Sequence, residues 1–425
     1  MGRSDARQPR PRRSVYYGWV IAGTLAVTEV TSWGVLYYAF AVFLVPMQAE
    51  LGWSKTAITG AYSMGLLVSG LAAPLVGRWL DQRGPRVLMT LGSIAGATLL
   101  LAWASIENLL AFYLVWIGIG LAMAATLYEP AFAVLAKWFE RGRARAFLIV
   151  TLAGGLASTI FLPLSAWLVE AQGWRGALLT LAAVLALLTI APHALVLRRR
   201  PEDLGLLPDG AELVHPSQRE AAQATNEPRR KPDGVPFGAA LRSSSLWLLA
   251  AAFFLGTLSQ AAIGVHLIPY LAEREYRLGS AATLTGLIGA SQVLGRVVVT
   301  FLEGRLSRQA LTTGISVVQA AALIVLIGWQ GPLGVLTFVV PFGAASGALT
   351  ISRASTVGDF YGPEHYGSIG GVVGMFVTGA RTLAPVGAAA MSVALGGYGP
   401  VLWALVSGSA LGAVAMFMAQ RVARP

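Results

Sequence analysis

Apolar runs of about 20 residues recur along this chain from Gly18 almost to its last residue, and they constrain its fold more than any other feature. A run of this length is what an α-helix needs to cross the hydrocarbon core of a bilayer. Composition agrees, because 56% of the 425 residues are apolar and only 12% are charged, about half the charge of a soluble domain. The runs are therefore predicted to be membrane-spanning helices, whose backbone polar groups are satisfied within each segment.

Twelve spans are predicted, at residues 17–46, 55–77, 86–106, 109–136, 144–170, 174–197, 243–271, 279–302, 311–330, 332–357, 367–395 and 399–420. Six precede and six follow one long polar segment, 198–242, which is predicted to be a cytoplasmic linker. The expected architecture is all-α, with two pseudo-symmetric six-helix bundles at 17–197 and 243–420 and short tails at 1–16 and 421–425. Repeats of this kind are typical of transporters that bind substrate at the midplane between the halves.

The basic residues indicate the orientation of the spans. With the N-terminus placed inside, 24 Lys and Arg residues fall in inside segments and 4 fall in outside loops, namely Lys55, Arg175, Arg274 and Arg277. This asymmetry predicts that both termini and the linker are cytoplasmic, in a multi-pass protein of the inner membrane. The net charge of +11 then belongs to loops that face an anionic leaflet, which argues against a nucleic-acid partner.

Motifs for chemistry are missing from the sequence. There is no Cys, which excludes disulfides and thiolate metal sites. We find no H-E-x-x-H pair, no clustered acidic metal site, no nucleophile with a plausible base and no nucleotide-binding loop. A monomeric transporter without cofactor or metal is therefore expected rather than an enzyme, with a small substrate and the lipid bilayer as its partners. A transporter-like sensor or scaffold is the alternative that a flux measurement would separate.

The loop between the second and third spans carries the most specific motif, G-R-W-L-D-Q-R-G-P-R at residues 77–86. It resembles the loop signature of the major facilitator superfamily, G-x-L-x-D-R-x-G-R-K. The matching residues are Gly77, Asp81, Gly84 and Arg86, with Arg83 shifted by one place. The motif is predicted to be a conformational gate, in which Asp81 holds the cytoplasmic ends of the two halves together in the outward-open state. The alternative is a solvated loop with a turn glycine.

Two further stretches resemble one branch of that superfamily. Tyr17-Gly18-Trp19 opens the first span, and the segment from Lys137 to Ala146, followed by Gly154-Gly155, enters the fifth. Together they are similar to the two signatures of the monocarboxylate porters and oxalate/formate antiporters. That similarity implies transport of a small organic anion.

Charged side chains inside spans cost about 2.5–3.5 kcal/mol each near the bilayer centre, so each one is a functional hypothesis. Glu29 in the first span and Glu129 in the fourth are acidic, and with His266 in the seventh they are the candidates for proton coupling. The structural alternatives are a hydrogen bond from Glu29 to another helix, an arginine partner for Glu129 and a packed His266. Arg353, closer to a helix end, is expected to extend to the membrane interface.

Two arginines lie deeper, both in the second half. Arg296 is about 9 Å from the inner end of its span and Arg381 about 21 Å from the start of its own, by helical rise. Arginine cannot lose its proton, so something anionic should meet each one. That partner is either the substrate or an internal carboxylate, Glu29 or Glu129.

The resemblance bears on these arginines as well. The monocarboxylate and oxalate carriers place a basic residue where Arg296 stands, and the oxalate carrier adds a second where Arg381 stands. Gln292 replaces the carriers' aspartate one turn before Arg296, which removes a carboxylate from the family's proton mechanism.

The predicted function is secondary active transport of a small organic anion, a carboxylate, by alternating access, as proton symport or anion exchange. The predicted substrate site comprises Arg296, Arg381, Tyr37, Tyr38, Trp33, Tyr128 and Gln292. The alternative is proton-coupled efflux of hydrophobic or cationic drugs, supported by a deep Glu29 or Glu129 in an aromatic-lined cavity. Two deep arginines argue against that alternative.

Overall fold

The computed structural model describes residues 16–210, 235–302, 305–329, 331–361 and 366–422. Most of the predicted linker, 211–234, and the predicted N-terminal tail up to residue 15 lie outside these ranges. The described helices are α1 (Tyr17–Ser32), η1 (Trp33–Tyr38), α2 (Phe40–Leu51), α3 (Lys55–Arg83), α4 (Pro85–Ala104), α5 (Leu109–Thr126), α6 (Tyr128–Trp138), α7 (Arg143–Gly155), α8 (Ala157–Leu185), η2 (Ala186–Ile190), α9 (Ala191–Val196), η3 (Pro201–Leu204), η4 (Pro208–Gly210), α11 (Phe237–Arg242), α12 (Ser244–Ala272), α13 (Leu278–Leu302), α14 (Arg308–Gly328), α15 (Pro332–Tyr361), α16 (Tyr366–Ala394) and α17 (Tyr398–Val422).

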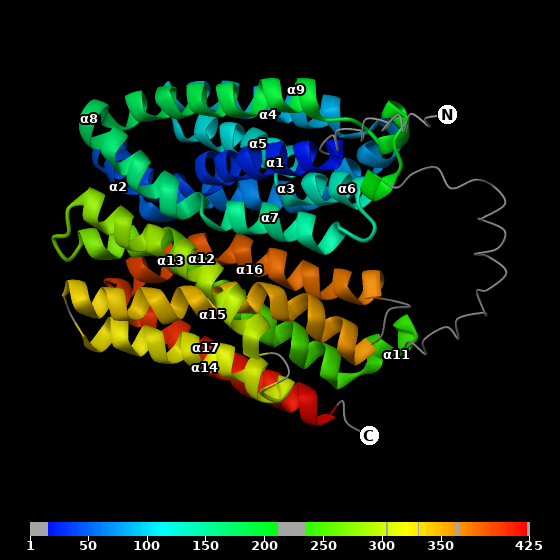
Figure 1. Cartoon of the computed structure of the whole chain (residues 1–425). Helices are drawn as coiled ribbons and strands as arrows, with labels where there is room; N and C mark the ends of the chain where they lie inside the picture. The colour runs from blue at the N-terminus through cyan, green and yellow to red at the C-terminus, as the bar shows by residue number, and fades with distance from the viewer. Residues whose placement is uncertain (1–15, 211–234, 303–304, 330, 362–365, 423–425) are drawn as a thin grey trace, which may run out of the picture.

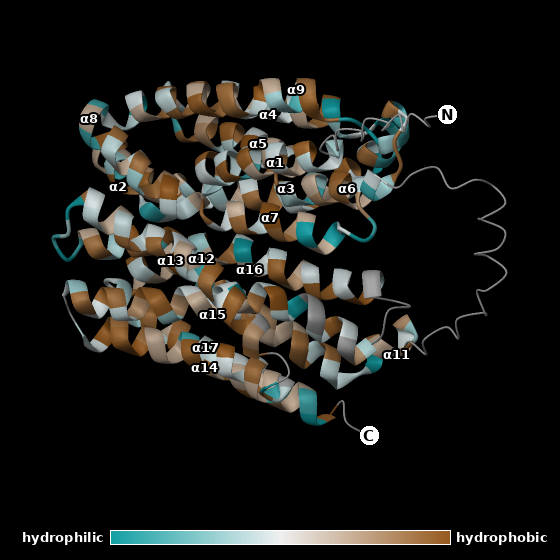
Figure 2. Ribbon diagram, in the orientation of Figure 1, coloured by the Kyte–Doolittle hydropathy of each residue, from teal (hydrophilic) through white to brown (hydrophobic). Residues whose placement is uncertain are grey.

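Within the described residues, 11 helical stretches are long and apolar enough to cross a membrane. The stretch Arg143–Val196 has 54 residues and turns back at Gly173, whose φ of +71° a side chain rarely adopts, so it supplies two spans and brings the total to twelve. The predicted all-α architecture with twelve spans is confirmed. Large apolar side chains face outward, as at Leu110 and Leu187, which are 72% and 75% exposed. Figure 2 shows hydrophobic residues along the helices and hydrophilic ones gathered toward their ends, which suits a lipid solvent.

The helices up to α9 pack mainly with one another, as do those from α11 onward (Figure 1). The two sets meet along two main seams, α3 against α16 and α8 against α13. We call the end of the bundle where α1 begins and α9 ends the linker end, because the chain leaves there toward α11, and the opposite end the far end. Every span thus runs between these two ends, and a space between the sets is bounded by helices of both.

Contacts between the two sets hold the far end together. Lys55, at the start of α3, pairs with Glu273, directly after α12. Glu170 of α8 accepts a hydrogen bond from the backbone N–H of Gly279 in α13 at 3.1 Å. Deeper along the same seam, the Thr159 hydroxyl donates to the carbonyl of Gly286 at 2.8 Å.

Four spans of the first set are interrupted near their middles, and in the sixth span the interruption is the π-helical segment η2. The first span passes through a π-helical segment, η1, where i→i+5 bonds widen the turn. The fourth breaks at Leu127, whose backbone is extended, and resumes as α6 with Pro130 in its first turn, where a missing N–H costs nothing. The fifth changes from α7 to α8 at Leu156. The interruptions change the direction of side chains at this depth.

Candidate functional site

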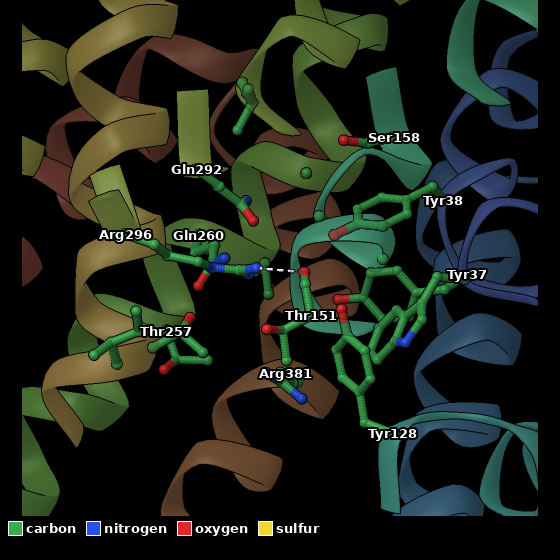
Figure 3. A pocket seen from close by; sticks show the side chains of 18 of the residues that line it. Tyr37, Tyr38, Tyr128, Thr151, Ser158, Thr257, Gln260, Gln292, Arg296 and Arg381 are labelled. Carbon is green, nitrogen blue, oxygen red and sulfur yellow. Dashed lines mark hydrogen bonds between the residues drawn. The ribbon is translucent and has the colours of Figure 1, made fainter. Parts of the chain in front are cut away.

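A cavity of about 240 Å³, the main cavity, lies between the two sets of helices. The first set contributes η1 and residues of α6, α7 and α8, next to the interruptions described above, while the second set contributes the continuous helices α12, α13, α15 and α16. Polar side chains stand on one side and aromatic ones on the other (Figure 3). The polar ones include Thr257, Gln260, Gln292 and Arg296, and the aromatic ones include Tyr37, Tyr38 and Tyr128.

Arg296 spans the cavity from α13 toward α7. Its Nη1 donates to the backbone carbonyl of Thr151 at 2.6 Å, and the residue is only 8% exposed (Figure 3). Gly155 makes room for it, since a Cβ at that position would lie 3.1 Å from Nη1. Gln292, one turn earlier on α13, lines the same wall and is also buried. The guanidinium of Arg296 thus donates to a neutral backbone carbonyl of the opposite set.

Arg381 enters from α16 and lines two spaces. It borders the main cavity and also a smaller pocket of about 130 Å³ between α3, α5 and α16, which we call the side pocket. Tyr38 lines the main cavity together with both arginines. The two predicted arginines therefore share one site.

The aromatic wall depends on the π-helical segment. Tyr37 and Tyr38 are adjacent in sequence, yet both line the cavity, with ring centroids 5.0 Å apart. Trp33 lies 5.0 Å from Tyr37 and 5.0 Å from Tyr128, again between centroids. A Cβ at Gly154 would overlap with the Tyr128 hydroxyl, so that glycine leaves room for the ring. All the residues predicted to bind substrate thus line one cavity.

The two acidic candidates are placed differently. Glu129, in the first turn of α6, lines both the main cavity and the side pocket. Glu29 is fully buried in α1, and neither of its carboxyl oxygens has a hydrogen-bond partner among the described residues. Glu29 therefore does not make the hydrogen bond to another helix, or the arginine pair, that the structural alternatives required.

His266 lies away from the main cavity. Its ring is buried between α16 and α17, with Nε2 2.7 Å from the carbonyl of Pro385 and Nδ1 2.9 Å from the hydroxyl of Tyr398. A carbonyl can only accept, so Nε2 carries the hydrogen and Nδ1 accepts from Tyr398. This arrangement is that of a packed histidine with both nitrogens satisfied, and it is not brought together with Glu29 or Glu129.

The loop motif lies at the linker end. Gly84 has φ +80° and ends α3, and Pro85 then begins α4. Asp81 lies 3.5 Å from Lys137 Nζ, and its backbone carbonyl accepts a hydrogen bond from Arg199 at 3.0 Å. These two partners belong to the first set and to the chain just after α9, so in this conformation Asp81 binds within one half.

The other motif residues are spread around this turn. The Arg83 guanidinium lies 4.6 Å from the centroid of the Trp79 ring. Arg86 lies in the first turn of α4 and is exposed. A Cβ added at Gly77 would meet no atom within 4 Å among the described residues.

Some cavity residues were not predicted. Thr257, Gln260, Thr285 and Ser158 are uncharged residues inside apolar spans, and no charge or motif distinguishes them in the sequence. Arg353 was expected to extend to the interface, but it lines the cavity. Position along its helix is a weak guide, because α15 runs on to Tyr361, two turns beyond Arg353.

Among the described residues, twelve apolar spans form two sets with a cavity lined by arginines between them, which is the architecture of a membrane transporter. Comparison with known families agrees, because the model of the Major Facilitator Superfamily matches residues 25–385. The chain belongs to that superfamily, and it is a multi-pass membrane protein.

The chain is also similar to individual transporters. The chain is 27% identical over 383 residues to monocarboxylate transporter 13 of Bos taurus, covering 85% of this chain and 82% of that one. It is 24% identical over 329 residues to a probable L-galactonate transporter of Escherichia coli, covering 76% and 69%. Among solved structures, a bacterial homologue of the human lysosomal transporter Spinster, in an inward-facing and occupied conformation, superposes with a TM-score of 0.74 at 15% identity over 96% of this chain and 98% of that one.

Proposed function

We propose that this protein is a secondary active transporter of a small organic anion, a carboxylate, which binds between Arg296 and Arg381. The observation that carries the proposal is that these arginines, from α13 and α16, line one cavity between the halves. Guanidinium groups stay charged at every relevant pH and can grip a carboxylate with two parallel hydrogen bonds. The monocarboxylate and L-galactonate relatives support the same class of substrate.

The proposal includes alternating access. The far end is held shut by contacts between the halves, and the predicted orientation places that end outside the cell. The conformation is then inward-facing. Substrate binding would neutralise charge in the cavity and lower the barrier to closing around a loaded site, so an empty carrier should switch slowly. Proton symport and anion exchange both fit this cycle.

The test is transport of a carboxylate panel by proteoliposomes with wild type, Arg296→Lys, Arg296→Ala, Arg381→Lys and Arg381→Ala. We expect both Ala variants to lose at least about tenfold in uptake, because a charge-assisted hydrogen bond contributes about 1.5–3 kcal/mol. The Lys variants should recover only part, since an ammonium lacks the planar fork. Exposed Arg277, at the far end, supplies the matched Arg→Ala control. Undiminished uptake by both folded Ala variants would refute the proposal.

A further inference from the structure

Arg381 lies next to a gap in the hydrogen bonding of its own helix. Pro385 stands inside α16, four residues after Arg381. A proline within a helix has no N–H to donate to the carbonyl four residues earlier, and its ring crowds that carbonyl. Here the carbonyl belongs to Arg381. The backbone that carries this guanidinium is therefore held less firmly by its own helix than the backbone at Arg296, since α13 contains no proline.

A histidine from a neighbouring helix binds α16 at the same place. His266 of α12 donates from Nε2 to the carbonyl of Pro385, with 2.7 Å between the two atoms. The histidine is only 4% exposed, and α12 packs along α16. Because the contact is buried, no water can replace the hydrogen bond, and breaking it leaves polar groups unsatisfied. The two helices are thus joined one turn beyond Arg381.

Tyr398 of α17 fixes the orientation of that histidine. Its hydroxyl lies 2.9 Å from His266 Nδ1 and donates to it. A neutral imidazole whose Nδ1 accepts a hydrogen bond carries its hydrogen on Nε2, the nitrogen that faces Pro385. Three helices of the second set, α12, α16 and α17, therefore meet at one histidine in a defined tautomer.

The first set also contains a buried histidine, and it offers a comparison. His193 of α9 has its Nδ1 2.9 Å from the hydroxyl of Ser93 in α4, while its Nε2 has no partner among the described residues. It joins two helices of the first set and lines neither the main cavity nor the side pocket. His193 is thus buried in a span without a link to either cavity arginine.

We propose that His266 is a positioning residue, which holds α16 at Pro385 and so keeps the guanidinium of Arg381 directed into the main cavity. His266 acts through Arg381 and does not touch the substrate, because it does not line that cavity. The inference rests on the proposed function for what Arg381 does. The direction of position 381 can nevertheless be measured without any substrate.

The first experiment measures where position 381 faces. In this Cys-free chain, Arg381→Cys supplies one thiol, and its rate of modification by a small anionic methanethiosulfonate is measured in detergent. Adding His266→Leu should lower that rate by at least about threefold, because one lost hydrogen bond shifts a conformational equilibrium by about two- to tenfold. His266→Gln should restore most of the rate, since an amide can both donate and accept.

Two controls distinguish the direction of position 381 from a general loosening of the protein. His193→Leu makes the same change at the buried histidine of the first set, and it should leave the rate at Arg381→Cys unchanged. Thr151→Cys places a thiol on the cavity wall formed by α7, and its rate should stay the same when His266→Leu is added. Apparent unfolding temperatures in detergent show whether each variant is folded.

A third variant tests the role of the proline. Pro385→Ala restores the N–H that the Arg381 carbonyl lacks, so α16 should hold this turn by itself. In that background His266→Leu should leave the thiol rate unchanged, which a histidine that only stabilises the fold would not predict. Should His266→Leu alone not fold, Tyr398→Phe removes only the hydrogen bond that orients the ring, and it should lower the rate in the same direction.

Transport then connects this position with function. Uptake of acetate, lactate and succinate by proteoliposomes should fall at least about threefold in His266→Leu, but no further when His266→Leu is added to Arg381→Ala. An unchanged or higher thiol rate in folded His266→Leu, or an equal loss of uptake with and without Arg381, would refute the inference. A wild type that carries no carboxylate would overturn the proposed function, while the thiol rates would still decide whether His266 positions residue 381.

Discussion

Arg296 and Gln292 reach the cavity because α13 and α15 touch backbone to backbone. A Cβ at Gly295 would overlap with the carbonyl of Ala344, and one at Gly347 would overlap with the carbonyl of Gln292. Backbone cannot yield as a flexible side chain can. In lipid, where helices gain little from the hydrophobic effect, such close approach supplies much of the association.

Gly295→Ala should therefore destabilise the carrier by about 1–3 kcal/mol, the usual cost of overpacking. The measurement is the apparent unfolding temperature in detergent. Gly314→Ala in α14 is the matched control, because no atom lies within 4 Å of the place its Cβ would take. That control should be neutral or should gain about 0.5–1 kcal/mol from lower chain entropy. Equal midpoints for the two variants would show that α13 and α15 can separate at little cost.

Glu129 is the one carboxyl among the described residues that line the main cavity, and Glu29 is fully buried in α1. If protons drive transport, Glu129→Gln and Glu29→Gln should each flatten the pH dependence of uptake, because an amide cannot release a proton. Uptake should be measured in proteoliposomes over pH 5–8. Glu107→Gln, exposed between α4 and α5, is the control and should behave as wild type. Wild-type pH dependence in both test variants would favour anion exchange.

At this scale the sequence reveals charge better than it reveals uncharged polarity. An arginine in an apolar span is costly wherever it faces, so Arg296 and Arg381 could be singled out without a structure. A threonine such as Thr257 can satisfy itself against its own helix, so its place on the cavity wall follows only from helix rotation.

At the scale of helices, too, the sequence predicts some features and not others. Apolar length predicts the spans, but not the π-helical turn at η1 or the break at Leu127, because both depend on tertiary packing. At η1, for example, Gly34 lies against Phe161 so closely that a Cβ would overlap with the ring. The break at Leu127 lies three residues before Pro130 and so places the proline in the first turn of α6, where its missing N–H leaves no helical hydrogen bond unmade.

The first residues of the predicted linker form a packed element at the linker end. Asp209 accepts hydrogen bonds from the backbone N–H groups of Glu140, Arg141 and Gly142 at 3.0, 2.6 and 3.0 Å. The Tyr16 hydroxyl lies 2.8 Å from the carbonyl of Trp138 and 3.2 Å from that of Leu207. The turn between α6 and α7 is therefore tied to the chain that follows α9.

Removing that tie with Asp209→Ala should raise hydrogen exchange at Arg141 and Gly142 by about tenfold, the loss expected from charge-assisted hydrogen bonds at an accessible site. Hydrogen-exchange mass spectrometry of this turn at pH 7 is the measurement. Asp203→Ala, which removes an exposed carboxylate paired with Arg200 in the same segment, should leave the turn unchanged. Equal protection in wild type and Asp209→Ala would show that other contacts hold the turn.

The hydrogen bonds that Asp209 accepts should also depend on pH. Partial burial opposes the charge of Asp209, but the three backbone donors outweigh it and hold its pKa below the ordinary value. A depressed pKa means that the stabilisation is complete above the unfolded-state pKa, near 3.9, and is lost as pH falls through the lower folded pKa. The tie is then intact throughout the physiological range and opens only in strong acid.

At the scale of the whole molecule, the contacts between the two sets at the far end are what the proposed alternating access must break. The Lys55–Glu273 pair joins the start of α3 to the end of α12, and the Lys55 ammonium also lies 4.8 Å from the Tyr398 ring centroid. Pairs of exposed charges contribute little energy, so this contact can break in each cycle. The sequence showed basic Lys55 in an outside loop but not its partner, because the pair is 218 residues apart and forms only when the halves meet.

A covalent link at that place should stop the cycle. The chain has no Cys, so Lys55→Cys with Glu273→Cys can be joined selectively by a short thiol-reactive cross-linker. We expect the linked carrier to lose at least about tenfold in uptake and to regain it when a cleavable link is reduced, because the halves can no longer separate at the far end. Carboxylate binding from the linker end should persist, since the main cavity is unaltered.

Glu50→Cys with Arg175→Cys is the matched control. That pair also forms an ion pair at the far end, at 3.0 Å, but both residues belong to the first set, so linking them should leave transport intact. Full uptake by the linked Lys55→Cys, Glu273→Cys carrier would mean that the halves do not separate there, and the rocking of one bundle against the other would have to be replaced by local movement of single helices.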